Sequence, residues 1–157
     1  MSGQAERTAI LGISYGAAVA LSVAETRDDI DAVVLECPFA NFERAVRSHS
    51  RLMELPLVTF TPVTLRIAEW MSGARFDSIQ PGRAISNYPG RLMIILAESD
   101  PFISPTEVEG LKQAAARREK NLAPATIWQV PGTSHLMALT ADAQEYARRL
   151  NEFMSGV

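Results

Sequence analysis

Short apolar runs alternate with amphipathic segments along this chain. Four runs rich in apolar or β-branched residues, 8–11, 32–35, 92–97 and 126–130, have the length and composition of strands. Three further segments, residues 17–25, a segment after residue 104 and one from about residue 140, are typical of helices. This alternation favours the α/β class, with a mostly parallel sheet covered by helices on both faces, and we expect a single domain over residues 1–157.

The helices after the third and fourth strands carry clear local signals. Ser104, Pro105 and Glu107 follow the order of a capping box with proline at the first helical position, which predicts the start of a helix. In the last helix, Tyr146, Leu150 and Phe153 recur at spacings of four and three residues, as expected for core packing.

Residues 41–79 interrupt the alternation and are predicted to form a cap-like insert above the sheet. Pro56 and Pro62 break the segment into roughly two helices, and we expect Asp77 to cap the turn that returns to the sheet. The insert is rich in large apolar side chains. Two interpretations stay open: the side chains bind a lipophilic acyl or alcohol group of a substrate, or they pack against the rest of the protein.

Composition limits the classes of partner. A chain of 157 residues that is 47% hydrophobic can bury a core, and a net charge of −3 favours neither nucleic acid nor an anionic membrane as partner. Cys37 is the one cysteine, which excludes an internal disulfide and fits a reducing, cytoplasmic compartment. We interpret it as a small buried hydrophobe with no histidine beside it. No apolar run has the length of a membrane span, and no signal peptide is visible.

The most informative motif is Gly12-Ile13-Ser14-Tyr15-Gly16, which lies between a predicted strand and a predicted helix. A strand, a G-x-S-x-G turn and a helix form a nucleophile elbow, in which the serine is held in strained backbone geometry at the carboxyl edge of the sheet. We expect both glycines to be required sterically, because a Cβ atom at either position would collide with the strand or the helix.

A serine nucleophile needs a base, and the base needs a carboxylate that orients it. The chain has two histidines. His49 lies in a polar stretch, and we interpret it as a solvated helix residue. His135 follows the last predicted strand and a Pro-Gly turn, which makes it the candidate base. The candidate acid is Asp100, which follows the buried run 92–97; Glu98 is the second choice, since it is nearer the strand and can pair locally.

Several stretches together carry a family resemblance: residues 10–18, 34–39, 76–79, 96–105 and 130–135. The chain resembles the carboxyl-terminal half of an α/β-hydrolase, and it is similar to the Bem46-like and serine aminopeptidase S33-like serine hydrolases. The resemblance implies that Ser14 is the nucleophile, Asp100 the orienting acid and His135 the base. It also implies that the peptide N–H of Tyr15 binds the substrate oxyanion, and it implies no cofactor and no metal.

The sequence departs from this superfamily at its start. Four strands normally precede the elbow strand, on the order of a hundred residues, whereas seven residues precede residue 8 here. We therefore expect a fragment, a split gene product or an aberrant gene model. If a natural amino-terminal half precedes these residues, a targeting segment could be part of it. In the superfamily the loop after the third strand donates the second oxyanion hydrogen bond, so that donor would be missing.

Two functions remain open at this point. The first is a serine hydrolase of the esterase type, which acts on a small-molecule acyl substrate through a covalent acyl-enzyme; a lipophilic substrate is expected if the insert binds it. The second is a catalytically silent α/β-hydrolase fragment that serves as an assembly or binding module. In either case the strand at 8–11 is expected to be an unprotected sheet edge, which predicts a homo-oligomer through that edge.

Overall fold

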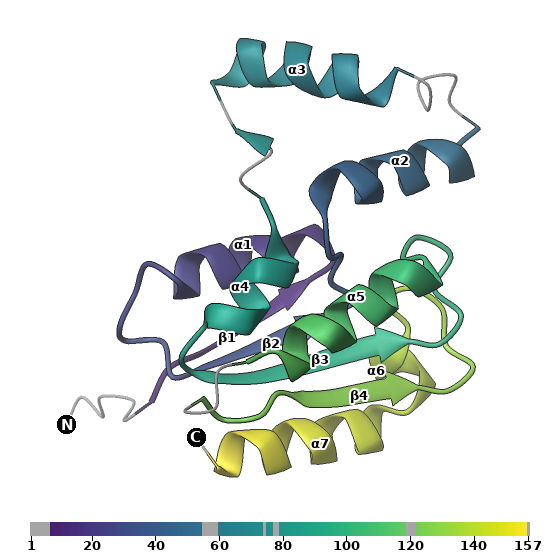
Figure 1. Ribbon diagram of the computed structural model, residues 1–157. Coiled ribbons are helices and arrows are strands. Elements are labelled where there is room, and N and C mark those ends of the chain that lie inside the picture. Colours follow the sequence, from purple (N-terminus) through teal and green to yellow (C-terminus); the bar gives the residue numbers. More distant parts are fainter. Residues whose placement is uncertain (1–6, 55–59, 74, 77–78, 119–121, 157) are drawn as a thin grey trace, which may run out of the picture.

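The fold is built on one parallel β-sheet. The computed structural model describes residues 7–54, 60–73, 75–76, 79–118 and 122–156. Its strands are β1 (Ala9–Ile13), β2 (Ala32–Glu36), β3 (Arg91–Ala97) and β4 (Thr126–Val130), and they lie side by side in the order β1-β2-β3-β4 (Figure 1). All three pairings are parallel, which confirms the predicted α/β class.

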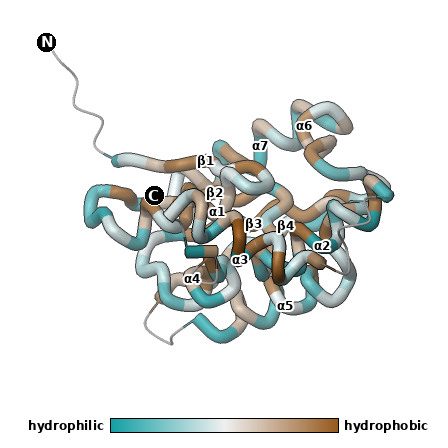
Figure 2. Tube along the Cα trace, turned by 90° about the horizontal axis from the view of Figure 1, so that it is seen from above, coloured by the Kyte–Doolittle hydropathy of each residue, from teal (hydrophilic) through white to brown (hydrophobic). Residues whose placement is uncertain are grey.

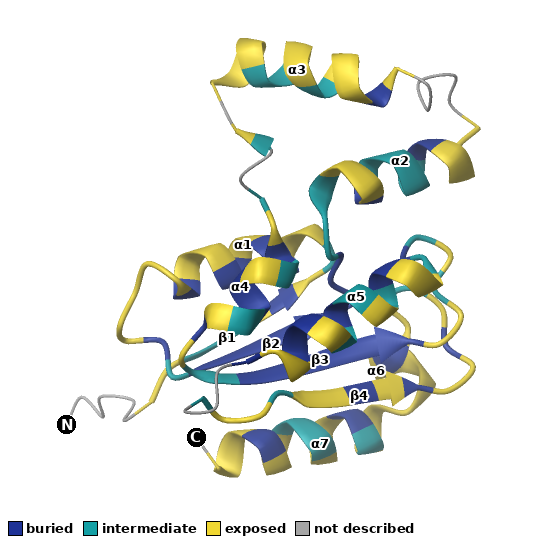
Figure 3. Ribbon diagram, viewed as in Figure 1, coloured by how far each residue is buried: buried dark blue, intermediate teal, exposed yellow. Residues whose placement is uncertain are grey.

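The position of each strand follows from its composition. β2 and β3 are central and buried along almost their whole length, as their uninterrupted apolar runs predict (Figure 3). β1 and β4 are the two edges among the described strands, and each has exposed residues between or beside less exposed ones. Because all strands are parallel, their carboxyl ends meet at one edge of the sheet. The loops that carry the candidate site therefore gather there.

Helices cover both faces of the sheet. On one face lie α1 (Tyr15–Ala24), α4 (Pro81–Asn87) and α5 (Pro105–Ala116), which share a core with the strands. The other face packs against α7 (Ala143–Ser155), which follows the short helix α6 (Ala138–Ala141) (Figure 1). Tyr146 and Phe153 are buried in this second core and Leu150 packs against it, as the spacing predicts. No helix in the described part of the chain is long and apolar enough to cross a membrane.

The segment between β2 and α4 stands away from the sheet. It contains α2 (Phe42–Leu52) and α3 (Thr61–Ser72), so the prediction of two helices is confirmed, with Pro62 in the first turn of α3 (Figure 1). Pro56 and Asp77 lie outside the described residues. The apolar side chains of this segment divide into two groups. Phe39, Phe42 and Ala45 pack in a small core with Ala18 and Ile103. Met53, Ile67, Trp70 and Met71 are each more than half exposed, and hydrophobic positions recur along α3 (Figure 2).

Local capping differs from expectation at two helices. Ser104 Oγ accepts the Glu107 N–H at 3.3 Å, but neither oxygen of the Glu107 carboxylate accepts a hydrogen bond from the described residues, so the capping box is half formed. The last long helix begins at Ala143 rather than near residue 140, because Asp142 Oδ1 accepts the Glu145 N–H at 2.9 Å and ends the short α6 before it.

Candidate active site

Ser14 occupies the turn that joins β1 to α1. Its backbone has φ 53° and ψ −119°, a conformation that costs free energy for a residue with a Cβ atom. The turn is held in place because the Ser14 N–H donates to the peptide oxygen of Glu36, at 2.8 Å, at the end of β2. The nucleophile elbow predicted from the sequence is therefore present as a backbone geometry.

The two glycines of the motif have different reasons to be there. A Cβ atom on Gly12 would lie 2.5 Å from the peptide oxygen of Gly16 and 2.6 Å from the Cβ atom of Ala20, so only glycine fits where β1 passes α1. A Cβ atom on Gly16 would meet nothing within 4 Å in the described structure. The expectation that both glycines are required sterically is thus wrong for Gly16.

The structure brings Ser14, Asp100 and His135 together. His135 Nδ1 donates to Asp100 Oδ2 at 2.6 Å, and the Ser14 hydroxyl lies 3.0 Å from His135 Nε2. The histidine and aspartate side chains are 10% and 3% exposed. Since Nδ1 must carry a proton to bind the carboxylate, Nε2 of the neutral ring is an acceptor that faces the serine hydroxyl. This is the arrangement that a serine needs to lose its proton.

Asp100 is held in one orientation from both of its oxygens. Oδ1 accepts the peptide N–H groups of Phe102 and Ile103, at 2.8 and 3.1 Å, while Oδ2 binds His135. Burial alone would raise the pKa of this carboxyl group, but the hydrogen bonds from His135 and the two peptide groups bring it below its usual range. Asp100 is therefore ionised at neutral pH, and its negative charge faces Nδ1 of His135.

Glu98, the second choice for the acid, has another partner. Its Oε2 atom accepts the Gly132 N–H at 2.7 Å, so it joins the end of β3 to the loop that carries His135. A second bond between the same loops runs from the Ser99 N–H to the Thr133 oxygen, at 2.8 Å. Both contacts fix the distance between the Asp100 and His135 loops. The partner of Glu98 is therefore in another loop, 34 positions away, and not local as the sequence suggested.

Cys37 lies directly behind the His135–Asp100 pair. It is 1% exposed, as predicted, and its backbone φ is 47°. Burial raises the pKa of the thiol to about 11, which keeps it protonated. No histidine was expected beside it, but Sγ, an Asp100 oxygen and a His135 nitrogen lie within 4.8 Å of one another. Among the described residues this trio could hold a metal ion; however, both ring nitrogens of His135 are already engaged by Asp100 and Ser14.

Glu36 is a site residue that the sequence did not indicate. Its carboxylate is buried at the end of β2, and Oε2 accepts a hydrogen bond from the Tyr146 hydroxyl of α7 at 2.8 Å. Burial, together with this bond and the negative charge of Glu36, raises the pKa of Tyr146 well above its ordinary value. The peptide oxygen of Glu36 accepts the hydrogen bond from the Ser14 N–H. The Glu36–Tyr146 pair therefore connects the elbow to α7.

His49 was interpreted as a solvated helix residue, and this is wrong. It is half-buried, and its ring stacks on Phe102 with 4.4 Å between ring centroids and an interplanar angle of 27°. The ring centroid of Phe102 in turn lies 5.0 Å from that of His135, and the ring centroid of Tyr15 lies 5.4 Å from that of His49. The insert therefore places a second imidazole above the candidate site.

Tyr15 follows Ser14 and begins α1. Its peptide N–H is the first of the helix and has no acceptor within it, which leaves a hydrogen-bond donor beside Ser14. Its ring packs against the rings of Phe39 and Phe42, with 5.3 and 5.9 Å between ring centroids. Partial burial, and to a lesser degree the charge of Glu107, raise the pKa of the phenol, which therefore stays neutral.

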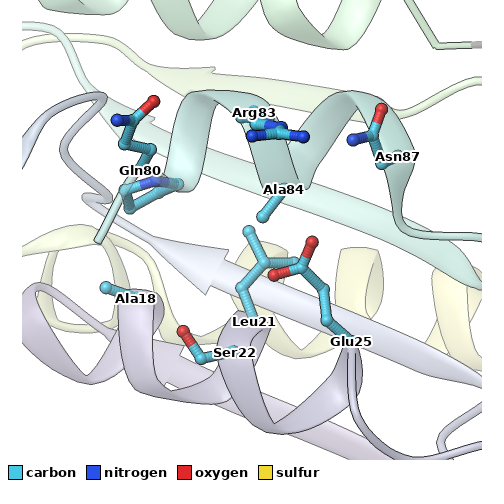
Figure 4. A pocket seen from close by; sticks show the side chains of 9 residues that line it. Ala18, Leu21, Ser22, Glu25, Gln80, Arg83, Ala84 and Asn87 are labelled. Atoms are coloured by element: carbon cyan, nitrogen blue, oxygen red, sulfur yellow. The ribbon is translucent and has the colours of Figure 1, made fainter. Parts of the chain in front are cut away.

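Two recesses flank α1, and they differ in polarity. An apolar groove of about 400 Å³ begins at Tyr15 and is lined by Val19, Val23, Phe39, Phe42 and Ile79 among others. A polar recess of about 320 Å³ lies between α1 and α4, where Glu25 and Arg83 project from opposite helices (Figure 4). None of Ser14, Asp100 and His135 lines either recess, but the apolar groove is lined by Tyr15, the residue that follows Ser14.

A model of a known protein family matches almost the whole chain. The model described as the prolyl oligopeptidase family matches residues 3–157. The chain belongs to the prolyl oligopeptidase family. This confirms the resemblance to α/β-hydrolases and assigns the chain to a named family of that superfamily. No curated protein matches the sequence.

Solved structures of hydrolases share the fold of this family member. The esterase Pf2001 of Pyrococcus furiosus has a TM-score of 0.68 at 18% identity, over 96% of this chain and 53% of that chain. A puromycin hydrolase bound to PGG has a TM-score of 0.58 at 16% identity, over 85% of this chain and 19% of that chain. The α/β hydrolase GrgF from Penicillium sp. sh18 has a TM-score of 0.57 at 16% identity, over 92% of this chain and 62% of that chain. The chain thus spans about half the length of the Pyrococcus furiosus esterase.

Proposed function

We propose that this member of the prolyl oligopeptidase family is a serine hydrolase that cleaves acyl compounds through a covalent acyl-enzyme. The observation that carries the proposal is the continuous chain of contacts from Asp100 Oδ2 to His135 Nδ1 and from His135 Nε2 to Ser14 Oγ. The strained backbone of Ser14 supports it, since strain of this kind is retained where the surrounding structure holds a residue in place for function.

Each residue has one role in the proposed reaction. Ser14 Oγ bonds to the carbonyl carbon while its proton passes to His135 Nε2. His135 then gives this proton to the leaving oxygen or nitrogen as the bond from the carbonyl carbon to the leaving group breaks. Water adds to the acyl-enzyme with His135 again as base, and the carboxylic acid departs. Asp100 keeps the ring oriented and stabilises its charged form. The reaction as written uses no cofactor.

The oxyanion that forms on the carbonyl needs hydrogen-bond donors. The Tyr15 N–H is one donor, and we infer no second donor from the residues that surround Ser14 in the described structure. Removal of one donor from such a site costs about a hundred- to a thousandfold in turnover. We therefore expect slow turnover from this chain by itself, with Ser14 still reactive towards strong electrophiles.

We infer a lipophilic acyl group on the substrate. The apolar groove of about 400 Å³ begins at Tyr15, so a chain bound at Ser14 can extend along the exposed side of α1. Val19 is 63% exposed there, which leaves apolar surface for a substrate to cover. The net charge of −3 favours a small-molecule substrate over nucleic acid.

A homo-oligomer through β1 completes the proposal. β1 pairs only with β2 in the described sheet, and Leu11 and Ile13 on this edge strand are 46% and 43% exposed. Charged residues or prolines usually protect such an edge, and β1 has neither. A second copy that pairs with β1 would cover this surface next to Ser14.

A second candidate function is a catalytically silent module that binds another chain through β1. The open sheet edge and the single oxyanion donor favour it. The two functions differ in one assay: hydrolysis of 4-nitrophenyl esters of short and medium acids by the full chain and by Ser14→Ala. Hydrolysis that is lost in the variant supports the hydrolase, whereas equal rates for both proteins would support the silent module.

A further inference from the structure

The polar recess between α1 and α4 takes no part in the proposed reaction. Its volume of about 320 Å³ is within the range of small-molecule binding sites, and both helices contribute to its lining. Leu21 and Ala84, whose side chains face each other between the helices, are 1% and 7% exposed (Figure 4). The exposed side chains of Glu25, Arg83 and Asn87 surround this apolar base. An apolar base with a few polar groups around it is the usual composition of a ligand site.

Helical spacing brings the polar side chains of each wall to the recess. Arg83 and Asn87 are four residues apart, so they lie on the same face of α4. On the opposite wall Ser22 and Glu25 are three residues apart, and Glu25 is the residue that ends α1. The two walls therefore present opposite charges, a carboxylate on α1 and a guanidinium on α4, to the same volume.

These two charges are not used within the protein. In the part of the chain that the structure describes, neither the Glu25 carboxylate nor the Arg83 guanidinium forms an ion pair or a side-chain hydrogen bond, and the Asn87 amide forms none either. A direct pair of exposed charges contributes little to stability, so the fold loses little by keeping them apart. The recess thus keeps a hydrogen-bond acceptor on one wall and a forked donor on the other.

The charges select the kind of ligand. Glu25 lies at the carboxyl end of α1, where the helix dipole adds to its negative charge, so this wall favours an ammonium group. The planar guanidinium of Arg83 matches a carboxylate, which it binds through two parallel N–H groups, and the Asn87 amide offers a further N–H. A phosphate with two negative charges would be repelled by Glu25. A ligand with one positive and one negative end therefore fits better than a simple anion or cation.

We propose that the polar recess binds a free amino acid with an apolar side chain. The ammonium group of the ligand lies at Glu25 and its carboxylate at Arg83, while its apolar side chain packs on Leu21 and Ala84. Since Ser14 does not line the recess, this binding is independent of the proposed hydrolase activity.

The test titrates L-leucine into the full chain and follows the backbone amides by NMR spectroscopy at about pH 7, where both ends of leucine are charged. We expect the signals of residues 21–26 and 82–88 to shift, with a dissociation constant of about 1 mM for so small a ligand. Two analogues each remove one end: N-acetyl-L-leucine has no ammonium group, and L-leucinamide has no carboxylate. Each analogue should bind about three- to fivefold more weakly, as the loss of an exposed ion pair predicts.

Two variants connect each end of the ligand to its partner. Glu25→Gln should weaken the binding of L-leucine about three- to fivefold and leave that of N-acetyl-L-leucine unchanged, since this analogue has no ammonium group. Arg83→Gln should weaken L-leucine to the same degree and leave L-leucinamide unchanged. Glu109→Gln, at an exposed carboxylate of α5, and Ser14→Ala should bind L-leucine like wild type. Unchanged amide signals outside the recess show that the variants fold.

Three results would overturn the proposal. The first is the absence of shifts in residues 21–26 and 82–88 at about 20 mM L-leucine, well above the expected dissociation constant. The second is equal affinity for L-leucine and both analogues, which would mean that neither charge is recognised. The third is a set of shifts centred on Ser14 and lost in Ser14→Ala, which would place leucine in the candidate active site.

Discussion

The Nε2 atom of His135 lies 3.0 Å from the hydroxyl oxygen of Ser14, although the two residues are 121 positions apart in the sequence. The distance is set by the sheet, because both side chains follow strands whose carboxyl ends meet at one edge. Ser14 follows β1 and His135 follows β4, and these are the outer strands of the four. The loop that holds Asp100, after β3, bridges the remaining space and fixes the ring.

Removal of the charge should reduce ester hydrolysis much more at Asp100 than at Glu98. Asp100→Asn removes the acceptor that fixes the His135 tautomer, so we expect ester hydrolysis to fall by about a thousandfold or more. Glu98→Gln keeps an oxygen that can accept the Gly132 N–H, and we expect less than about a tenfold loss. The measurement is kcat/KM for a 4-nitrophenyl ester, with circular dichroism to show that both variants fold. A larger loss in Glu98→Gln would mean that the acid is assigned to the wrong carboxylate.

Tyr146→Phe should weaken the fold from a position far from the substrate. The variant keeps the ring packed beside Trp128 but removes the hydroxyl that donates to the buried Glu36 carboxylate. We expect the free energy of unfolding in urea to fall by about 1 to 3 kcal/mol. Glu36→Gln in the same background is the matched control, since an uncharged partner should reduce the loss. Equal stability of wild type and Tyr146→Phe would show that the hydrogen bond contributes nothing.

Glu107 predicts a pH dependence of stability. Burial raises the pKa of this carboxyl group, so the folded state binds a proton at pH values where the unfolded state has already released it. The contribution of Glu107 to the free energy of unfolding is therefore greatest below the ordinary carboxyl pKa of about 4.3. This contribution declines as the pH rises through the pKa of Glu107 in the folded state.

Glu107→Gln should remove this dependence. We expect the variant to gain stability relative to wild type as the pH rises from about 4 to about 7. Urea unfolding at several pH values measures the difference, and Glu109→Gln, an exposed carboxylate on the same helix, is the control. A difference between Glu107→Gln and wild type that does not change with pH would contradict the expectation.

A single charged substitution on β1 tests whether the chain associates through this strand. Ile10 packs partly against the core, but Leu11 lies on the opposite face of the strand and is 46% exposed, which makes it the better site for substitution. We expect wild type to sediment as a dimer or larger assembly at micromolar concentration and Leu11→Lys to sediment as a monomer. Val63→Lys, on the exposed side of α3, should leave the assembly intact. A wild-type monomer would contradict the proposal, and dissociation by Val63→Lys alone would locate the interface on the insert.

The strands could be predicted from the sequence because burial on both faces leaves no room for polar residues. The run 92–97 is apolar throughout and becomes β3, whose residues after Arg91 are all buried. α4 could not be predicted as a separate helix, since it has seven residues and too few turns to show a helical period. The start of α7 was placed a few residues early because Asp142, not Thr140, caps it.

The candidate site was predictable where a local motif carries it and not where tertiary packing does. Ser14, Asp100 and His135 each follow a strand, so strand prediction places them at one edge. Glu36 gave no such signal, because its partner Tyr146 is 110 positions away. His49 lies in a polar stretch of sequence, and only the position of α2 above the sheet brings it to Phe102.

The central claim, that Ser14 is the nucleophile, is tested most directly by mass spectrometry of the chain after treatment with a fluorophosphonate probe. We predict one adduct per chain on the peptide that contains Ser14, and no adduct in Ser14→Ala. The free energy of unfolding of Ser14→Ala should stay within about 1 kcal/mol of wild type. Ser22→Ala, at an exposed serine of α1 that lines the apolar groove, should label like wild type. An adduct on any other serine, or equal labelling of wild type and Ser14→Ala, would contradict the account.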